Sequence, residues 1–340
     1  MEHISTFAQQ AKSLISNANN IIILAHKNPD GDAIGSGLGM YHHIKTMGKE
    51  AIFILPDQLP KNLLWMPGCD KILVHKSPEK EQAEQAITKA DLIIMCDFNN
   101  LSRLGGAAQL VEQSTAKKIL IDHHLEPSVV CDIKYSRPEA SSTCEMVYQV
   151  VSTMRGTPTI DSTIATCLYT GIVTDTGGFS YSSSNRLTFD VAANLIESGI
   201  DKDYILDNLN YHFSEQRLRL LGYCLNNKLT VIPEYHTAYI WLTQKELRKF
   251  NYQMGDTEGI VNYPLTIDGI EFSAIFTEKE KITKCSFRSR GSFPASKVAG
   301  DHFNGGGHLN AAGGESPLSI SETIKKFVSI LPQYEQYIEK

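Results

Sequence analysis

Apolar residues fall into short continuous runs in the first half of the chain, and segments with helical periodicity separate these runs. A strand is apolar on both faces when helices cover both sides of its sheet, so such runs predict parallel strands. The pattern therefore predicts an α/β domain with a parallel sheet and helices on both faces. The expected strands are 20–26, 51–55, 91–97 and 118–124, and the expected helices are 31–47, 144–154 and 160–173.

The second half of the chain has a different pattern. Residues 189–225 are helical in pattern without a strand signal, and strand candidates return only after Lys228. A second, smaller α/β domain is expected there, with strands at 229–232, 237–242, 270–276 and 282–288, a helix near 294–303 and a glycine turn at 305–307. The predicted boundaries are 1–200 for the first domain, 201–227 for a helical linker and 228–340 for the second domain.

Composition narrows the class of protein. A chain of 340 residues with 42% hydrophobic residues suits two globular domains, and a net charge of -6 offers no general basic field for long duplex nucleic acid. The seven cysteines are scattered and odd in number, which favours free thiols over a disulfide framework. Neither a signal peptide nor a membrane span is apparent, so we expect a cytoplasmic protein without a membrane partner. The oligomeric state stays open, with a homodimer as one alternative.

Residues with metal-binding chemistry follow three of the expected strands. His26 ends the first strand, Asp97 ends the strand 91–97, and the strand 118–124 ends in Asp122, His123 and His124. Ligands of an open parallel sheet bind beyond the carboxyl ends of its strands, so these side chains are expected to converge. Further carboxylates that could join them are Asp30 and Asp32, just after the first strand, and Asp175, at the end of a helical pattern.

The convergence of so many carboxylates has an electrostatic consequence. Like charges in one crevice would raise one another's pKa values, and divalent cations remove that repulsion. A mixed set of imidazoles and carboxylates suits manganese, iron or zinc better than magnesium. A single Asp at a strand end is more often a helix cap, and a lone His in an apolar strand more often belongs to the core. An interpretation in which these residues are only helix caps and core residues, however, requires four independent coincidences at one sheet edge. The residues therefore predict a site for two divalent cations of the kind that serves phosphoryl transfer.

The sequence contains neither of two glycine-rich nucleotide-binding motifs in full. The glycines at 35, 37 and 39 lack the full spacing of a dinucleotide fingerprint, and Asp30 and Asp32 stand where a pyrophosphate would need positive potential. We expect these glycines to allow close packing of a helix on the sheet. The P-loop pattern does not occur in the sequence.

Other residues are expected to have structural roles. His3, His42 and His43 are expected at exposed helix positions, and Tyr181 with the serines that follow is expected to form a turn and helix cap.

The motifs in this order resemble the DHH phosphoesterase superfamily. The first half carries H-x-x-x-D-x-D, the strand-end Asp, D-H-H and the later Asp. The second half, with Ser286 to Ser289 and the run from Gly305 to Gly313, is similar to the associated DHHA-type domain. The nano-RNase subgroup, which has oligoribonuclease and 3'-phosphoadenosine 5'-phosphate phosphatase activity, is the most similar. The resemblance implies a DHH catalytic domain followed by a DHHA-type substrate-binding domain.

The resemblance also implies roles for individual residues. One ion would be held by His26, Asp30 and Asp97, and the other by Asp32, Asp97, His123 and Asp175, with Asp97 bridging. Asp122 would support the site from behind, and His124 would face the scissile phosphate. Manganese is the expected metal.

Substrate recognition is expected in the second domain. Arginine binds phosphate bidentately and consecutive glycines let backbone N–H groups approach an anion, so the candidates are Arg288, Gly305, Gly306, Gly307 and His308. Arg103, just after the Asp97 strand, is a further candidate for phosphate contact. The expected substrates are short RNA, dinucleotides and a nucleoside bisphosphate. Alternatives are an inorganic pyrophosphatase, a RecJ-like single-strand exonuclease and, outside the enzymes, a nucleotide-binding regulator.

Overall fold

The chain forms two compact units, Met1–His212 (unit 1) and Phe213–Lys340 (unit 2). The computed structural model describes residues 2–76, 78–180, 183–211, 213–253 and 255–338, with side chains from Ile4 onward. The exposure expected for the His3 side chain and the turn expected at Tyr181 and Ser182 lie outside what the structure describes. The segment predicted as a linker contains two helices, α8 (Lys202–Asn210) in unit 1 and α9 (Glu215–Tyr223) in unit 2.

Unit 1 is built on a parallel sheet, as predicted. All its strands pair in parallel, and their order in the sheet is β3-β2-β1-β4-β5-β6. The chain runs outward from β1 and then returns to β4, so the order reverses between these two neighbours. The strands are β1 (Ile21–Leu24), β2 (Ala51–Leu55), β3 (Leu73–Val74), β4 (Leu92–Cys96), β5 (Lys117–Asp122) and β6 (Ile133–Ser136).

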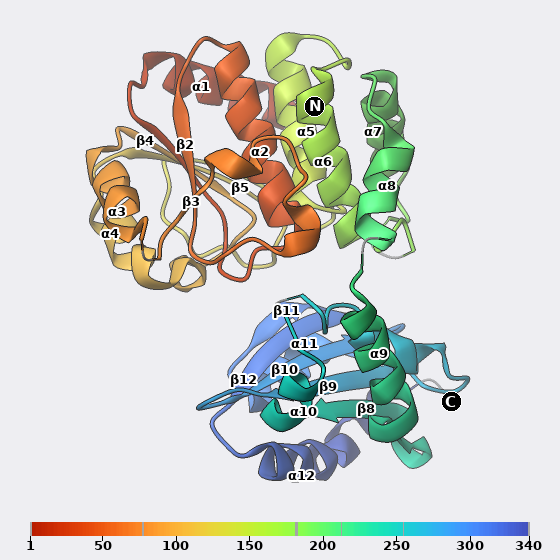
Figure 1. Cartoon of the computed structure of the whole chain (residues 1–340). Helices are drawn as coiled ribbons and strands as arrows, with labels where there is room; N and C mark the ends of the chain where they lie inside the picture. Colours follow the sequence, from red (N-terminus) through yellow and green to blue (C-terminus); the bar gives the residue numbers. More distant parts are fainter. Residues whose placement is uncertain (1, 77, 181–182, 212, 254, 339–340) are drawn as a thin grey trace. The chain divides into compact units, whose positions relative to one another are not determined.

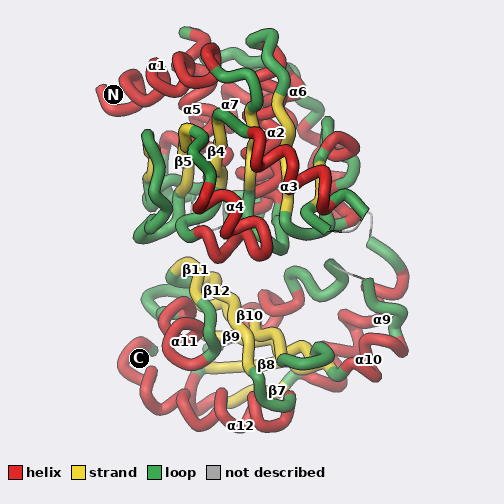
Figure 2. The backbone as a smooth tube through the Cα atoms, turned by 90° about the vertical axis from the view of Figure 1, so that its left-hand side faces the viewer, coloured by secondary structure: helices red, strands yellow, loops and turns green. Residues whose placement is uncertain are grey.

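Helices cover both faces of this sheet (Figures 1 and 2). Because side chains alternate along a strand, Ile21 and Ile23 of β1 enter one core while Ile22 and Leu24 enter the other. The core with Ile21 lies under α1 (Glu2–Asn17), α2 (Gly31–Thr46), α5 (Thr143–Arg155) and α6 (Ser162–Asp175). The opposite core lies under α3 (Lys80–Lys89) and α4 (Ala108–Gln113). Helix α7 (Arg186–Glu197) and α8 pack outside α5 and α6 (Figure 1).

Unit 2 contains a smaller mixed sheet with the order β11-β12-β10-β9-β8-β7. Its β8 and β9 pair in parallel, whereas the other neighbours are antiparallel. A phenylalanine-rich core joins one face to α11 and α12, and a second core joins the other face to α9 and α10. The elements are β7 (Thr230–Ile232), β8 (Thr237–Leu242), α10 (Gln244–Lys249), β9 (Phe272–Glu278), β10 (Thr283–Ser289), α11 (Ala295–His302), β11 (Gly306–His308), β12 (Ala311–Ser316) and α12 (Ile320–Ile330).

The expectation that His42 and His43 of α2 are exposed was wrong. His43 is buried with 2% exposure, and His42 is half-buried with its ring bonded to the Pro67 carbonyl, so neither is an exposed helix position. The glycines of α2 serve helix–helix packing as well as helix–sheet packing. A Cβ on Gly35 would lie 2.5 Å from the Cys167 carbonyl oxygen of α6, which shows how closely these two helices approach.

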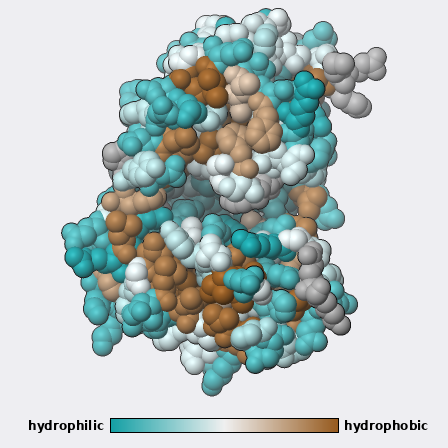
Figure 3. All heavy atoms as spheres, turned by 90° about the vertical axis from the view of Figure 1, so that its right-hand side faces the viewer, coloured by the Kyte–Doolittle hydropathy of each residue, from teal (hydrophilic) through white to brown (hydrophobic). Residues whose placement is uncertain are grey.

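The surface mixes polar and apolar side chains on the face drawn in Figure 3. Exposed large apolar residues include Phe189 on α7 and Leu218 on α9. Among the described residues, no helix combines the length and the apolar character needed to cross a membrane. All seven cysteines are free, six of them buried, as the sequence predicts.

Candidate metal centre

The carboxyl ends of β1 and β4 lie on either side of the reversal in strand order, where open parallel sheets bind ligands. His26 follows β1 after one intervening residue and is buried. Asp30 then caps α2, with its Oδ1 accepting hydrogen bonds from the backbone N–H groups of Asp32 (3.1 Å) and Ala33 (3.0 Å). The first turn of the helix therefore fixes both carboxylates of the H-x-x-x-D-x-D motif beside the end of β1.

Asp97 immediately follows β4 and has an unusual backbone conformation. Its φ of +65° lies in the left-handed region, which costs energy for a residue with a Cβ although Asp tolerates it better than most. Its N–H donates to the Ile121 carbonyl at 3.0 Å, so the end of β5 holds this turn in place. Strain of this kind tends to mark functional sites. At Asp97 it leaves a fully buried carboxylate at the rim of the sheet.

The end of β5 supplies a carboxylate and two imidazoles. Asp122 is the last residue of the strand and is completely buried, and His123 and His124 follow it. The Nδ1 of His124 lies 2.8 Å from the Asp122 Oδ1, and the His124 backbone N–H donates to the same oxygen. Because a carboxylate only accepts, the proton of this contact resides on Nδ1. Asp122 therefore orients His124.

Asp175 reaches the same place from a helix rather than a strand. It is the last residue of α6. Gly171, one turn earlier, lets α6 approach closely, because a Cβ there would lie 2.2 Å from Cys144 Sγ and 3.1 Å from Asp32 Cα. This contact between α2, α5 and α6 brings Asp175 Oδ2 to 3.5 Å from His123 Nε2.

Two neighbouring groups of side chains result. The His26 Nε2 lies 3.7 Å from Asp30 Oδ2 and 3.3 Å from Asp97 Oδ2. The His123 Nε2 lies 3.8 Å from Asp32 Oδ2 and 3.6 Å from Asp97 Oδ1. Ligand-type atoms of His26, Asp30 and Asp97 lie within 4.8 Å of one another, as do those of Asp32, His123 and Asp175. Asp97 thus directs one carboxylate oxygen toward each group.

The electrostatics of the cluster favour a bound cation. Burial raises the pKa of Asp97 well above its ordinary value, and the neighbouring carboxylates of Asp32 and Asp30 raise it further. Burial alone would lower the pKa of His123, yet the carboxylates around it, led by Asp175 and Asp32, raise it. Both shifts express excess negative charge in a place sheltered from water. A donor set of two imidazoles and four carboxylates around that charge fits divalent metal ions.

A segment that sequence reasoning missed holds three of these side chains. The Thr143 N–H donates to Asp32 Oδ2 at 2.7 Å and the Cys144 N–H to Asp32 Oδ1 at 2.8 Å, both from the first turn of α5. The Thr143 hydroxyl donates to Asp97 Oδ1 at 2.9 Å. The Ala140 carbonyl lies 3.3 Å from His123 Nδ1, which leaves Nε2 for the cluster. The local sequence does contain a capping pattern, since Ser142 accepts from the Glu145 N–H, but this predicts only a helix start.

Arg103 lies on the turn Leu101–Ala107, close to the first group. Its carbonyl accepts from the Lys27 N–H at 2.7 Å. Burial lowers the pKa of His26, the Asp30 carboxylate opposes this effect, and the positive charge of Arg103 adds to the lowering. Arg103 is therefore within electrostatic reach of the cluster, as an approach to phosphate requires.

The glycine run of unit 2 forms a strand, which corrects the prediction of a flexible turn. Gly306 and Gly307 belong to β11, and β11 pairs with β12. Gly307 has a φ of +146°, and a Cβ there would lie 2.4 Å from the Ala311 carbonyl oxygen. A Cβ on Gly305 would lie 2.0 Å from the Gly313 carbonyl oxygen. The glycines are therefore needed for close strand packing, a requirement that a turn motif does not reveal.

The strand register places Arg288 and His308 on one face of the unit 2 sheet. Both residues stand opposite Ala311 of β12, Arg288 from β10 and His308 from β11. Residues directly opposite each other point to the same face, so the two side chains flank a small alanine. Phe287, the neighbour of Arg288, points to the other face and into the core. The structure thus places Arg288 and His308 on one face of the unit 2 sheet, on the two strands that flank β12.

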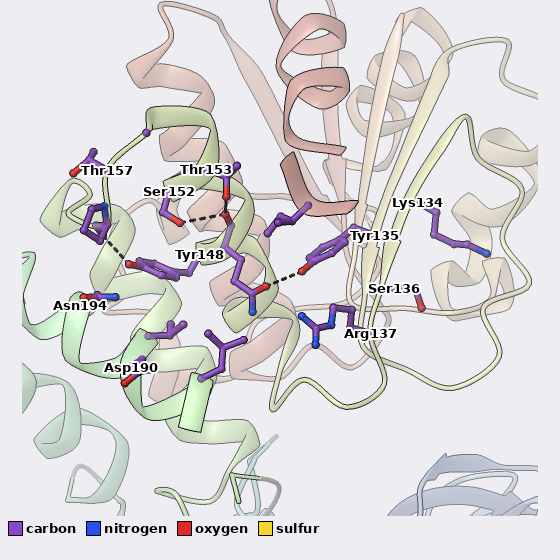
Figure 4. Close-up of a pocket in the computed structure, with 16 residues that line it drawn as sticks. Lys134, Tyr135, Ser136, Arg137, Tyr148, Ser152, Thr153, Thr157, Asp190 and Asn194 are labelled. Atoms are coloured by element: carbon purple, nitrogen blue, oxygen red, sulfur yellow. Dashed lines mark hydrogen bonds between the residues drawn. The ribbon is translucent and has the colours of Figure 1, made fainter. Parts of the chain in front are cut away.

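A surface groove of about 1010 Å³ in unit 1 contains none of the candidate ligands. Residues of β6, α5 and α7 line it, including Tyr135, Tyr148 and Asn194 (Figure 4). The candidate metal ligands therefore lie elsewhere in unit 1 than this groove.

Comparison with known proteins agrees with these features. The N-terminal domain of the DHH family matches residues 20–172, and the DHHA1 domain matches residues 234–337. The bifunctional oligoribonuclease and PAP phosphatase NrnA of Thermus thermophilus is 29% identical over 293 residues, which are 86% of this chain and 83% of that protein. The cyclic-di-AMP phosphodiesterase GdpP of Bacillus subtilis is 26% identical over 95% of this chain, but only 49% of GdpP is covered.

Solved structures extend the comparison. An exopolyphosphatase-related protein from Bacteroides fragilis is 42% identical, with a TM-score of 0.92 and 98% of both chains covered. The RecJ of Thermus thermophilus, crystallised with Mn²⁺, shares the fold at 12% identity with a TM-score of 0.58, over 99% of this chain and 55% of RecJ. Both domains, their order and the near-complete match to one solved relative lead to one conclusion: this chain belongs to the DHH/DHHA1 phosphoesterase family.

Proposed function

We propose that this protein is a manganese-dependent phosphodiesterase that hydrolyses short oligoribonucleotides and dinucleotides to mononucleotides. We extend the proposal to removal of the 3'-phosphate of 3'-phosphoadenosine 5'-phosphate. The observation that carries it is the position of Asp97, whose two oxygens face two separate groups of imidazole and carboxylate side chains. A carboxylate between two such groups is what a pair of cations sharing one bridging ligand requires.

The residues divide into two ligand sets. We assign His26, Asp30 and Asp97 to one cation, and Asp32, Asp97, His123 and Asp175 to the other. When bound, a pair of divalent cations supplies the Lewis acidity that activates water and neutralises phosphate oxygens.

His124 is the group that we propose contacts the scissile phosphate. Asp122 accepts from its Nδ1, which holds the ring in a fixed orientation. A protonated imidazole so held donates from Nε2 and stabilises negative charge on the phosphate oxygens as the ester bond breaks. Arg103 supplies a further positive charge on the side of the cluster where His26 lies.

We propose that unit 2 is the substrate-binding domain. Arg288 would bind a terminal phosphate, and His308 with the small residues beside it would contact the nucleotide. The oligoribonuclease activity named for the Thermus relative supports a short RNA substrate. The same domain pair also occurs in relatives named as cyclic-di-AMP phosphodiesterases and as an exopolyphosphatase-related protein, so cyclic dinucleotides and polyphosphate are the competing substrates.

A substrate panel tests the proposal. Initial rates are compared on a linear dinucleotide, a longer RNA, adenosine 3',5'-bisphosphate, cyclic-di-AMP, pyrophosphate and polyphosphate, each with Mn²⁺ or with EDTA. The dinucleotide is expected to be the fastest nucleic-acid substrate, and EDTA is expected to abolish hydrolysis until Mn²⁺ is restored. Hydrolysis that survives EDTA, or turnover of pyrophosphate or polyphosphate alone, would overturn the proposal. The panel is repeated with Asp97→Ala, which removes the proposed bridging carboxylate. Asp132→Ala, at a carboxylate paired with Lys117 outside the cluster, is the control for that variant.

A further inference from the structure

Glu145 is a buried carboxylate of unit 1 that belongs to neither ligand set. It lies in the first turn of α5 with only 1% exposure. Its Oε2 accepts from the Ser141 N–H at 3.3 Å, the Ser141 hydroxyl at 2.7 Å and the Thr188 hydroxyl at 2.7 Å, and its Oε1 accepts from Gln149 at 3.3 Å. A carboxylate buried this deeply is tolerated only when donors satisfy it, and here several uncharged donors converge on it.

The partners of Glu145 show what it holds together. Ser141 lies just before the helix cap Ser142, whereas Thr188 belongs to α7. Glu145 therefore fixes the chain entering α5 both to its own helix and to a neighbouring helix. The Gln149 contact extends this network, because Gln149 also accepts from the Tyr135 hydroxyl at 2.7 Å on the wall of the groove (Figure 4).

The segment that Glu145 fixes is the one that contacts the candidate ligands. Residues 140–144 touch His123 through the Ala140 carbonyl, Asp32 through two backbone N–H groups, and Asp97 through the Thr143 hydroxyl. Each of these contacts constrains a candidate ligand side chain through backbone or a fully buried side chain. Displacement of the segment by a few tenths of an ångström would shift ligands from three different strand or helix ends together.

We infer that Glu145 is a positioning residue of the metal centre, which it orders by locking segment 140–144 onto α7. This inference rests on the proposed metal-binding role of Asp32, Asp97 and His123. Residues that orient metal ligands commonly change metal affinity by about tenfold to a hundredfold when they are altered. Loss of the Glu145 acceptor is therefore expected to weaken metal binding without removing any ligand.

The test measures Mn²⁺ binding to folded, metal-free protein by isothermal titration and by the electron paramagnetic resonance signal of free Mn²⁺. Glu145→Gln keeps the size of the side chain but replaces one of its two acceptor oxygens with an N–H donor, so the side chain can no longer accept from Ser141, Thr188 and Gln149 together. It is expected to raise the Mn²⁺ dissociation constant about tenfold to a hundredfold. Glu246→Gln is the control, since Glu246 in unit 2 accepts from Thr243 and Tyr223, also pairs with Lys228, and lies outside the metal centre. It is expected to lower thermal stability and leave Mn²⁺ affinity unchanged.

Thr188→Val and Thr188→Ser provide a second, milder pair. The valine variant removes only the hydroxyl that donates to Glu145 and is expected to weaken Mn²⁺ binding, whereas the serine variant keeps the hydroxyl and is expected to restore it. Wild-type Mn²⁺ affinity in both Glu145→Gln and Thr188→Val would overturn the inference and leave Glu145 a residue of stability alone. If Glu145→Gln weakens Mn²⁺ binding but the wild-type protein hydrolyses no dinucleotide, the proposed function is contradicted and this inference is supported.

Discussion

The buried histidine of α2 gives a quantitative prediction for stability. His43 is 2% exposed, and neither ring nitrogen has a hydrogen-bond partner among the residues that the structure describes. Burial lowers its pKa from 6.5 to about 4, and the positive charges of Arg155 at the end of α5 and Lys12 on α1 add to that lowering. His43 is therefore neutral in the folded chain across a range in which it is protonated in the unfolded chain.

The sign and size of the effect follow from proton linkage. Between pH 6.5 and about pH 4 the unfolded state binds more protons at this site, so the stability that neutral His43 allows is lost as pH falls. A site with these two pKa values lowers the free energy of unfolding by about 2 kcal/mol between about pH 7.5 and about pH 5. His43→Leu removes this contribution, and its pH dependence should be weaker by that amount.

Urea unfolding of unit 1 measures the difference. The chain has two tryptophans, so Trp241→Phe leaves Trp65 of unit 1 as the only tryptophan reporter. Unfolding free energies are compared with and without His43→Leu at about pH 7.5 and about pH 5, in EDTA so that metal binding does not contribute. Parallel pH dependence in the two proteins would refute the reasoning, because it would mean that His43 titrates alike in the folded and unfolded states.

Three further predictions concern the site. Asp97→Ala is expected to abolish dinucleotide hydrolysis and reduce the number of Mn²⁺ ions bound in titration, since Asp97 faces both groups; wild-type turnover would contradict the bridging assignment. Thr143→Val is expected to raise the Mn²⁺ dissociation constant about tenfold or more while Thr143→Ser does not, because only valine removes the hydroxyl bonded to Asp97. Arg288→Ala is expected mainly to raise KM for a dinucleotide, by about tenfold for one lost charged contact; an equal loss on pyrophosphate would argue against nucleotide recognition.

The sequence predicted the central strands of both units because their signal is strong. β1 and β4 are nearly continuous apolar runs, as strands covered on both faces must be. β3 and β6 were not predicted, because they lie at the two edges of the sheet, where a strand needs less apolar surface. β3 has only two residues, and β6 is mostly half-exposed or exposed. A period-2 pattern cannot emerge from the two residues of β3, and the four residues of β6 alternate but offer only Ile133 and Tyr135 as apolar positions.

The prediction of a turn at Gly305 to Gly307 was wrong for a different reason. Three successive glycines suit a turn as well as a strand that lies against another backbone, and only the partner strand decides between them. Here Gly305 and Gly307 face carbonyl oxygens of β12 at distances that exclude a Cβ. That constraint depends on pairing with residues at 311–313, which the local sequence does not predict.

The metal centre shows where prediction from residue types ends. Strand-end Asp and His residues could be identified because parallel topology brings the carboxyl ends of strands to one rim. The groups that orient them are mainly backbone N–H and carbonyl groups of residues 140–144, which every residue possesses and no motif distinguishes. Glu145 has a sequence signature only as a helix-capping residue, and its contact with Thr188 spans 43 positions. The convergence of the candidate ligands can therefore be predicted from chemistry and topology, whereas the network that orients them emerges only when helices α5 and α7 are placed beside each other.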